Sequence, residues 1–178
     1  KPRFGPQEDT AKTHFFVSRK GQIEHLLTIS GTFGTVWCSP EGDVHIALPN
    51  KILWMKKEGD TWIKTAFAAP DILFEIWGRF NDEAFAWGLH KLFHWDGITW
   101  NESPFPGEIY AVHGAEKGTV TAVGRFGLIV RWDGTTWQKL PSPTNEDLVS
   151  IHVVDEKRMF IAGKTTYGRN YVAYLHEY

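Results

Sequence analysis

Along the chain, short stretches in which apolar and polar residues alternate are separated by turn residues. Alternation with a period of two is typical of strands that bury one face. The sequence shows no sustained i, i+3, i+4, i+7 spacing of apolar residues, which would indicate an amphipathic helix. Seventeen Gly and nine Pro residues are spread along the chain and predict many turns. The pattern therefore predicts an all-β protein.

A short phrase recurs three times between such strands. It consists of an acidic residue, Gly, any residue, Thr and Trp, and it ends at Trp62, Trp100 and Trp137, at intervals of 38 and 37 residues. An acidic residue followed by Gly between two strand-like runs predicts a hairpin turn, because Gly adopts a positive φ at little cost. The phrase therefore predicts the same turn in three repeated units.

Strand-like runs surround the phrase at equivalent positions of each unit. First strands are expected at 34–38, 73–78 and 109–114, second strands at 43–48, 83–88 and 119–124, and third strands at 51–56, 91–94 and 128–131. The Thr and Trp of the phrase then open the fourth strand. A fourth unit lacks the phrase and keeps three strands, at 148–153, 158–163 and 170–176. Two further strands are expected near the N-terminus, at 14–18 and 23–29.

Four-stranded antiparallel sheets that repeat at this interval predict a small β-propeller of four or five blades. We expect the N-terminal hairpin 13–29 to complete the last sheet, so that strands from both ends of the chain close the ring. Closure would remove the exposed sheet edges that favour aggregation. The whole chain, 1–178, is then a single domain with repeats at about 31–66, 72–103, 108–140 and 148–178.

The units also resemble a known group of sequences. Trp77-Gly78 at the end of a first strand, and Trp-Asp-Gly-x-Thr-Trp at 95–100 and 132–137, resemble bacterial β-propeller repeats with blades of the DGxTW type. The resemblance covers residues 31–178 and implies the fold, with little implication for function. The phrase is also distantly similar to the Asp-box of sialidase-type propellers. That box has an extra residue between Asp and Gly, which are adjacent here.

Composition narrows the classes of function. Nineteen basic and twenty-one acidic residues give a formal net charge of −2, which provides no overall field for nucleic acid or membrane. Cys38 is the only cysteine, so an intramolecular disulfide is excluded and we expect a small buried residue there. The longest apolar runs are too short to span a bilayer, and the first residues do not resemble a secretion signal. We expect a cytoplasmic protein without a cofactor.

Two sets of residues are candidates for a metal or catalytic site. Trp37, Trp77, His113 and His152 occupy equivalent positions of the first strands. Because a metal site needs three or four ligands, two His fall short, and we expect this position to pack between blades. The acidic residues of the turns lie on separate blades, which disfavours a calcium site or a catalytic pair. An enzyme is therefore not expected, although a lyase or glycosidase that uses His113 and His152 is a third hypothesis.

The two rims of the predicted propeller differ in charge. Loops between second and third strands share one rim with the connections between blades, and we expect a binding surface there made of Lys51, Phe67, His90, Lys91, Phe105, Arg125, Phe126, Lys164, Tyr167 and Arg169. The opposite rim is expected to be acidic, with Glu41, Asp43, Glu58, Asp60, Asp82, Glu83, Asp96, Glu116, Asp133, Asp155 and Glu156. The alternative is that these are ordinary solvated loops whose aromatic residues pack inward.

These features favour a non-enzymatic module that recognises another protein with an acidic surface, because cationic and aromatic side chains steer and anchor such partners. A specific form of this hypothesis is an inhibitor or immunity-type protein that plugs the active site of its partner. The alternative is a carbohydrate-binding lectin in which Trp87, Trp95 and Trp132 stack on sugars.

Overall fold

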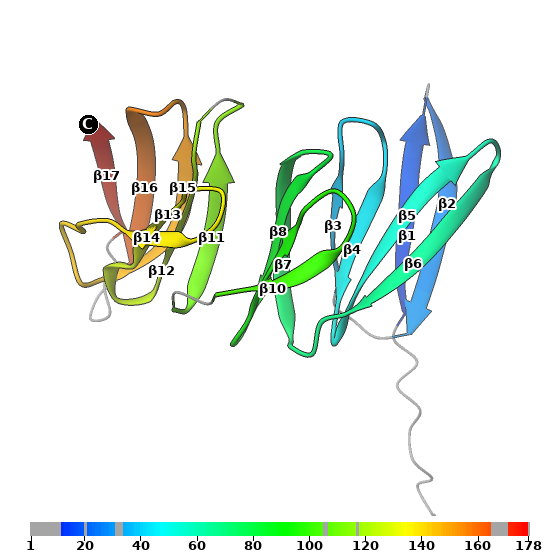
Figure 1. Ribbon diagram of the computed structural model, residues 1–178, viewed down its shortest axis with the longest axis horizontal. Helices are drawn as coiled ribbons and strands as arrows, with labels where there is room; N and C mark the ends of the chain where they lie inside the picture. Colours follow the sequence, from blue (N-terminus) through cyan, green and yellow to red (C-terminus); the bar gives the residue numbers. More distant parts are fainter. Residues whose placement is uncertain are drawn as a thin grey trace, which may run out of the picture. The chain divides into compact units, whose positions relative to one another are not determined.

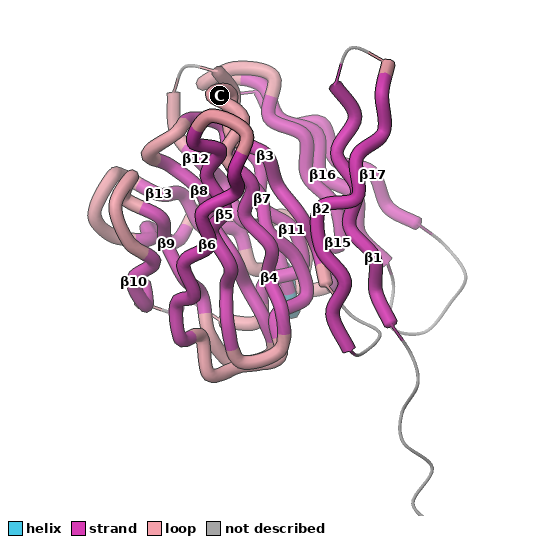
Figure 2. Tube along the Cα trace, turned by 90° about the vertical axis from the view of Figure 1, so that its right-hand side faces the viewer, coloured by secondary structure: helices cyan, strands magenta, loops and turns pink. Residues whose placement is uncertain are grey.

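The computed structural model describes residues 12–19, 21–30, 34–104, 107–116, 118–164 and 171–177. The chain divides into two compact units, Lys1–Gly34 and Thr35–Tyr178, so the expectation of a single domain stays a prediction. Strands, drawn in magenta in Figure 2, make up almost all of the regular structure. Within the described ranges, no helix has the length and apolar character needed to cross a membrane.

The first unit contains an antiparallel hairpin. β1 (Lys12–Arg19) pairs with β2 (Gln22–Ser30) in a two-stranded sheet. This confirms the two N-terminal strands that the alternation of apolar and polar residues predicted. The closure of a ring by this hairpin stays a prediction.

The second unit contains four antiparallel sheets (Figure 1). The first sheet comprises β3 (Thr35–Cys38), β4 (Val44–Leu48), β5 (Lys51–Glu58) and β6 (Thr61–Ala68), and the second comprises β7 (Leu73–Phe80), β8 (Glu83–Gly88), β9 (Leu92–Trp95) and β10 (Trp100–Ser103). The third comprises β11 (Ile109–Gly114), β12 (Val120–Gly124), β13 (Ile129–Trp132) and β14 (Trp137–Lys139), and the fourth comprises β15 (Asp147–Val153), β16 (Arg158–Lys164) and β17 (Tyr171–Glu177). In each sheet the strands lie in chain order, as in a propeller blade, and each expected strand is found within two residues of its predicted ends.

The acidic residue of the repeated phrase holds its turn closed. Asp133 Oδ1 accepts the backbone N–H groups of Thr135 and Thr136 at 2.9 and 2.7 Å. Gly134, which directly follows Asp133, has a φ of 97°. The turn at Asp96 has the same two bonds, both at 2.9 Å. A carboxylate one methylene from the backbone reaches these N–H groups. The predicted turns are thus confirmed, with a positive φ at the Gly.

The first copy of the phrase forms a shorter turn. There Glu58 replaces Asp, and the two strands continue until Glu58 pairs with Thr61. Only Gly59 and Asp60 remain between the strands, and Gly59 has a φ of 61°. The longer Glu side chain therefore goes with a two-residue hairpin loop instead of the turn that Asp closes.

Neighbouring sheets of the second unit pack through their first strands. The indole of Trp37 in β3 lies over Gly78 in β7, where an added Cβ would come within 2.6 Å of the ring. In the third sheet His113 takes the place of Trp37, and its Nδ1 accepts the backbone N–H of Val153 at 3.1 Å. The smaller His113 ring thus faces Val153, which is larger than the Gly78 that lies under Trp37. This confirms that the positions of Trp37 and His113 pack between blades, whereas His152 at the equivalent position of β15 is exposed.

In the second and third sheets, the Trp that precedes the phrase and the Trp that ends it fill the cores between sheets. In each of two sheets they surround an aromatic residue of the preceding sheet: Trp95 and Trp100 around His45, with ring centroids 4.9 and 5.7 Å away, and Trp132 and Trp137 around Phe85, at 5.6 and 5.3 Å. The repeat therefore encodes both a local turn and the aromatic contacts that join one blade to the next.

Cys38 corrects one expectation, since it is exposed and not buried. Cys38 directly follows Trp37 in β3, as Gly78 directly follows the equivalent Trp77 in β7 of the next sheet. Gly78 is covered by a ring from the sheet before it. Cys38 belongs to the first sheet of the second unit, so no earlier sheet of that unit covers it.

Candidate binding face

On one side of the second unit, the short loops are hydrogen-bonded to the connections between sheets. The backbone N–H of Asn50 donates to the carbonyl of Asp71 at 2.9 Å, and that of Leu89 donates to the carbonyl of Ile72 at 3.2 Å. The N–H of Arg125 donates to the carbonyl of Glu108 at 2.9 Å. Each bond links a loop between second and third strands to the connection that leads into or out of that sheet. We call the surface formed by 49–51, 69–72, 89–91, 107–108, 125–128 and Lys164 the loop face.

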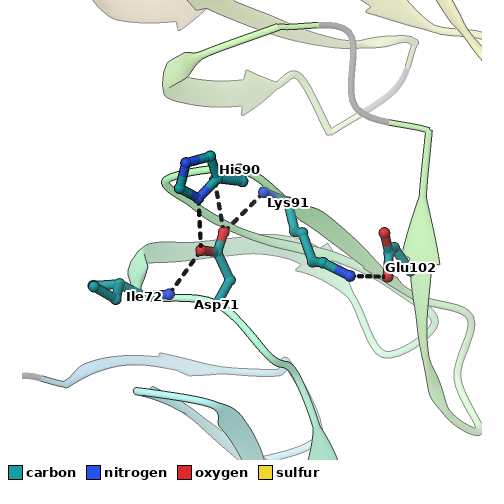
Figure 3. Close-up of polar contacts among 5 residues, drawn as sticks. All are labelled: Asp71, Ile72, His90, Lys91 and Glu102. Carbon is teal, nitrogen blue, oxygen red and sulfur yellow. Dashed lines mark hydrogen bonds and ion pairs between the residues drawn. The ribbon is translucent and has the colours of Figure 1, made fainter.

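Asp71 is a buried acceptor that fixes the loop between β8 and β9 (Figure 3). Its Oδ2 accepts the backbone N–H groups of His90 and Lys91, both at 2.8 Å, and its Oδ1 accepts that of Ile72 at 2.9 Å. The exposed His90 ring places Nδ1 3.5 Å from Oδ1, while Lys91 Nζ donates to Glu102 Oε2 at 2.6 Å. The backbone of this loop is therefore fixed, and the His90 side chain remains accessible.

The loop between β12 and β13, which contains the 3-10 turn η1 (Arg125–Gly127), presents a cation and an aromatic ring together. Phe126 is 70% exposed, and its backbone N–H donates to Asp147 Oδ1 at 3.1 Å. The Arg125 guanidinium lies 4.7 Å from the centroid of the Phe126 ring. The φ of Phe126 is 55°, a left-handed conformation that is uncommon for a bulky residue and is found preferentially at functional sites.

The other predicted binding residues are distributed differently. Lys51 at the start of β5 and Lys164 at the end of β16 are exposed. Phe67 is instead half-buried in the core between the first two sheets, 5.7 Å from Trp95 by ring centroids. Phe67 therefore does not join an exposed aromatic patch, because its position in β6 faces the neighbouring sheet. Three predicted residues lie outside the described residues: Phe105, Tyr167 and Arg169.

The Trp residues proposed to stack on sugars are buried. Trp87, Trp95 and Trp132 belong to the cores between sheets. The Trp95 indole N–H donates to the carbonyl of Asn81 at 2.7 Å. This overturns the predicted lectin role of these residues, because a sugar needs an exposed ring face on which to stack.

His113 and His152 contact each other, with ring centroids 4.6 Å apart. Burial, and secondarily the neighbouring charge of His152, lower the pKa of His113. His113 Nδ1 is already occupied by the Val153 N–H, so the ring has a packing role. Among the side chains that the structure describes, no group of three or more His, Cys, Asp or Glu is arranged to hold a metal ion.

Two carboxylates of the predicted acidic rim, Asp133 and Asp155, close their own turns. Hydrogen bonds from the backbone N–H groups of Thr136 and Thr135 lower the pKa of Asp133 to about 2. Asp155 accepts the N–H groups of Lys157 and Arg158, both at 2.9 Å. These acids have the structural role that the repeated turns predicted.

Three acidic residues with a role at the loop face were not singled out from the sequence. Asp71, Glu108 and Asp147 each lie within two residues ahead of the first apolar residue of a first strand. This recurrence in three units is a sequence pattern that could have identified them. Their side chains bond to the loop of the same or the preceding sheet, a relation that the sequence alone does not show.

No family model matches the sequence, and no curated protein matches it. The structure is similar to that of YCF48 from Cyanidioschyzon merolae, with 16% identity, a TM-score of 0.55, and coverage of 81% of this chain and 50% of that chain. It is also similar to the structure described as YCF48 bound to D1 peptide, with 17% identity, a TM-score of 0.59, and coverage of 92% and 60%. This chain thus spans 50 to 60% of the length of those proteins. The likeness shows the fold, which is that of a β-propeller.

Proposed function

We propose that this chain is a non-enzymatic binding module that recognises another protein through its loop face. The observation that carries the proposal is a platform of hydrogen-bonded loops that displays apolar and cationic side chains together. Ile72 and Phe126 are 57% and 70% exposed, and Lys51, Arg125 and Lys164 are exposed on the same loop face. Exposed aromatic and Arg residues on a fixed scaffold are typical of protein interfaces.

The chemistry of the loop face favours a partner with an acidic surface, because complementary charges accelerate encounter and orient the two proteins. YCF48, which has a similar fold, has a structure described as bound to D1 peptide, which supports a peptide or protein as the ligand class. A more specific form of the proposal is an inhibitor or immunity-type protein. In that form, the partner loses its own activity when the loop face is bound.

The test is selection of a random-peptide library, displayed on phage, against the immobilised full chain. A loop-face variant, Lys51→Glu with Lys164→Glu, should lose the enriched peptides. The matched control is Lys64→Glu with Lys157→Glu, which makes the same change in net charge at exposed positions outside the loop face. We expect the control to retain the peptides. Equal binding by both variants, or no enrichment on the unaltered chain, would contradict the proposal.

A further inference from the structure

A shallow hollow lies beside the exposed Arg125–Phe126 pair. Its volume is about 390 Å³, and its lining residues are Gly107, Glu108, Arg125, Phe126, Leu128 and Lys139. It therefore combines an apolar part with two cations and one carboxylate. A hollow of this kind suits one apolar side chain and one anionic group from the same ligand.

The carboxylate in the hollow belongs to the protein itself. Glu108 Oε2 accepts a hydrogen bond from Arg125 Nη1 at 2.9 Å. The other oxygen, Oε1, accepts the hydroxyl of Tyr110 at 3.1 Å. Burial, and secondarily the bond to Glu108, raise the pKa of Tyr110 to about 12, so Tyr110 remains a donor at ordinary pH. Glu108 thus has an anchor that does not depend on Arg125.

The ion pair between Arg125 and Glu108 is suited to replacement of its carboxylate by another carboxylate. Both side chains are partly exposed, at 50% and 29%, and an ion pair of that kind contributes only about 0 to 1 kcal/mol. If Glu108 moves away from Arg125, the bond to Tyr110 can persist, and Lys139 lines the same hollow as a second cation. Stacking on Phe126 keeps the guanidinium in place. An incoming carboxylate therefore meets a cation that is already positioned.

We propose that Glu108 occupies Arg125 in the unbound protein as an internal substitute for a carboxylate of the partner. A partner Asp, Glu or C-terminal carboxylate displaces it, and an adjacent apolar side chain of the partner packs on Phe126 and Leu128. The inference rests on the proposed function and names the ligand of the loop face as an acidic–apolar peptide segment. The strained, exposed Phe126 is then the anchor whose position the bond to Asp147 maintains.

The experiment uses the most enriched peptide from the phage selection, synthesised with a fluorescent label, and measures its Kd for the full chain by fluorescence anisotropy. Glu108→Gln removes the competing charge and should tighten binding by about two- to fivefold, the equivalent of up to about 1 kcal/mol. Asp155→Asn is the matched control, since Asp155 forms a similar exposed pair with Arg158 outside the loop face, and it should leave the Kd unchanged. Arg125→Gln should weaken binding and abolish the effect of Glu108→Gln.

The ligand side is tested with the same peptide carrying Asn or Gln in place of its acidic residues, or an amide at its C-terminus. This peptide should bind more weakly and should no longer distinguish Glu108→Gln from the unaltered chain. Unchanged or weaker binding by Glu108→Gln, or a selected peptide without an essential carboxylate, would overturn the inference. If the Lys51 and Lys164 variant still loses binding in that case, the proposed function stands and only the role of Glu108 falls.

Discussion

Lowering the pH from neutral should destabilise the fold through one buried histidine. His45 in β4 is 1% exposed and is surrounded by Trp rings of two sheets. Its Nδ1 accepts the indole N–H of Trp100 at 3.3 Å. Burial lowers the pKa of His45 from 6.5 to about 4, because a charged imidazolium would lose its hydration there. A protonated ring would also have no acceptor left for Trp100.

The sign and size of the effect follow from this pKa. As the pH falls below 6.5, the unfolded chain takes up a proton at His45, whereas the folded chain resists it down to about pH 4. Stability from this group is therefore complete above pH 6.5 and is lost as the pH falls toward 4. At about 1.4 kcal/mol per unit of pKa, the full loss is about 3 kcal/mol, and about 2 kcal/mol is already lost near pH 5.

The assay is urea unfolding followed by tryptophan fluorescence, at about pH 7.5 and about pH 5, which yields the free energy of unfolding at each pH. Burial also lowers the pKa values of His94 and His113, so the total decrease exceeds the share of His45. His45→Gln keeps an acceptor for Trp100 but does not titrate. Its free energy of unfolding should therefore fall by about 2 kcal/mol less than that of the unaltered chain.

Two results would refute this reasoning. One is an equal pH-dependent decrease for His45→Gln and the unaltered chain. The other is an NMR titration in which the His45 ring of the folded protein protonates near pH 6.5. Either result would mean that the ring is hydrated, and that the aromatic core between the first two sheets is open to water.

The remaining predictions concern the loops, the packing and the closure of the fold. Asp71→Asn should lower the free energy of unfolding by about 2 kcal/mol, because an amide cannot replace both acceptor oxygens; urea unfolding with no loss would show that the loop does not need this carboxylate. Gly78→Ala should cost about 2 kcal/mol by forcing the Trp37 ring away, and an unchanged Tm would contradict the close approach. Gly134→Val should cost about 1 kcal/mol or more, because a β-branched residue resists a positive φ; equal stability of the variant would argue against that turn. Deletion of 1–29 should unfold or oligomerise the chain if the hairpin closes the ring, so a stable monomer by light scattering would exclude closure.

Much of the fold could be predicted from the sequence because its determinants are local. An acidic residue and Gly at 96–97 and 133–134 fix a turn through bonds within four residues, and period-two alternation marks the strands beside it. The equal spacing of the three phrases then predicts equal units. The positions of the strands, their order and the class of fold follow from these local patterns.

The loop face could be located from the predicted order of strands and loops, but only some of its proposed binding residues could be identified from the sequence. The sequence singled out Arg125 and Phe126 as cationic and aromatic residues in a loop. It did not show that Phe126 adopts a left-handed φ, or that Glu108 is bonded to Arg125. Those facts depend on which residues of a loop and a connection face each other, and a single sequence does not contain that register.

Local patterns in the sequence are sufficient to specify an all-β chain of repeated four-stranded units with tight turns, because backbone hydrogen bonds and the strand period act over a few residues. The role of the Trp residues, in contrast, depends on how the sheets pack. Trp95 and Trp132 are potential sugar platforms as isolated residues, but contacts with His45 and Phe85, tens of residues earlier in the chain, bury them between sheets. Burial of a large aromatic ring depends on the neighbouring sheet that covers it, and that neighbour comes from a different repeat.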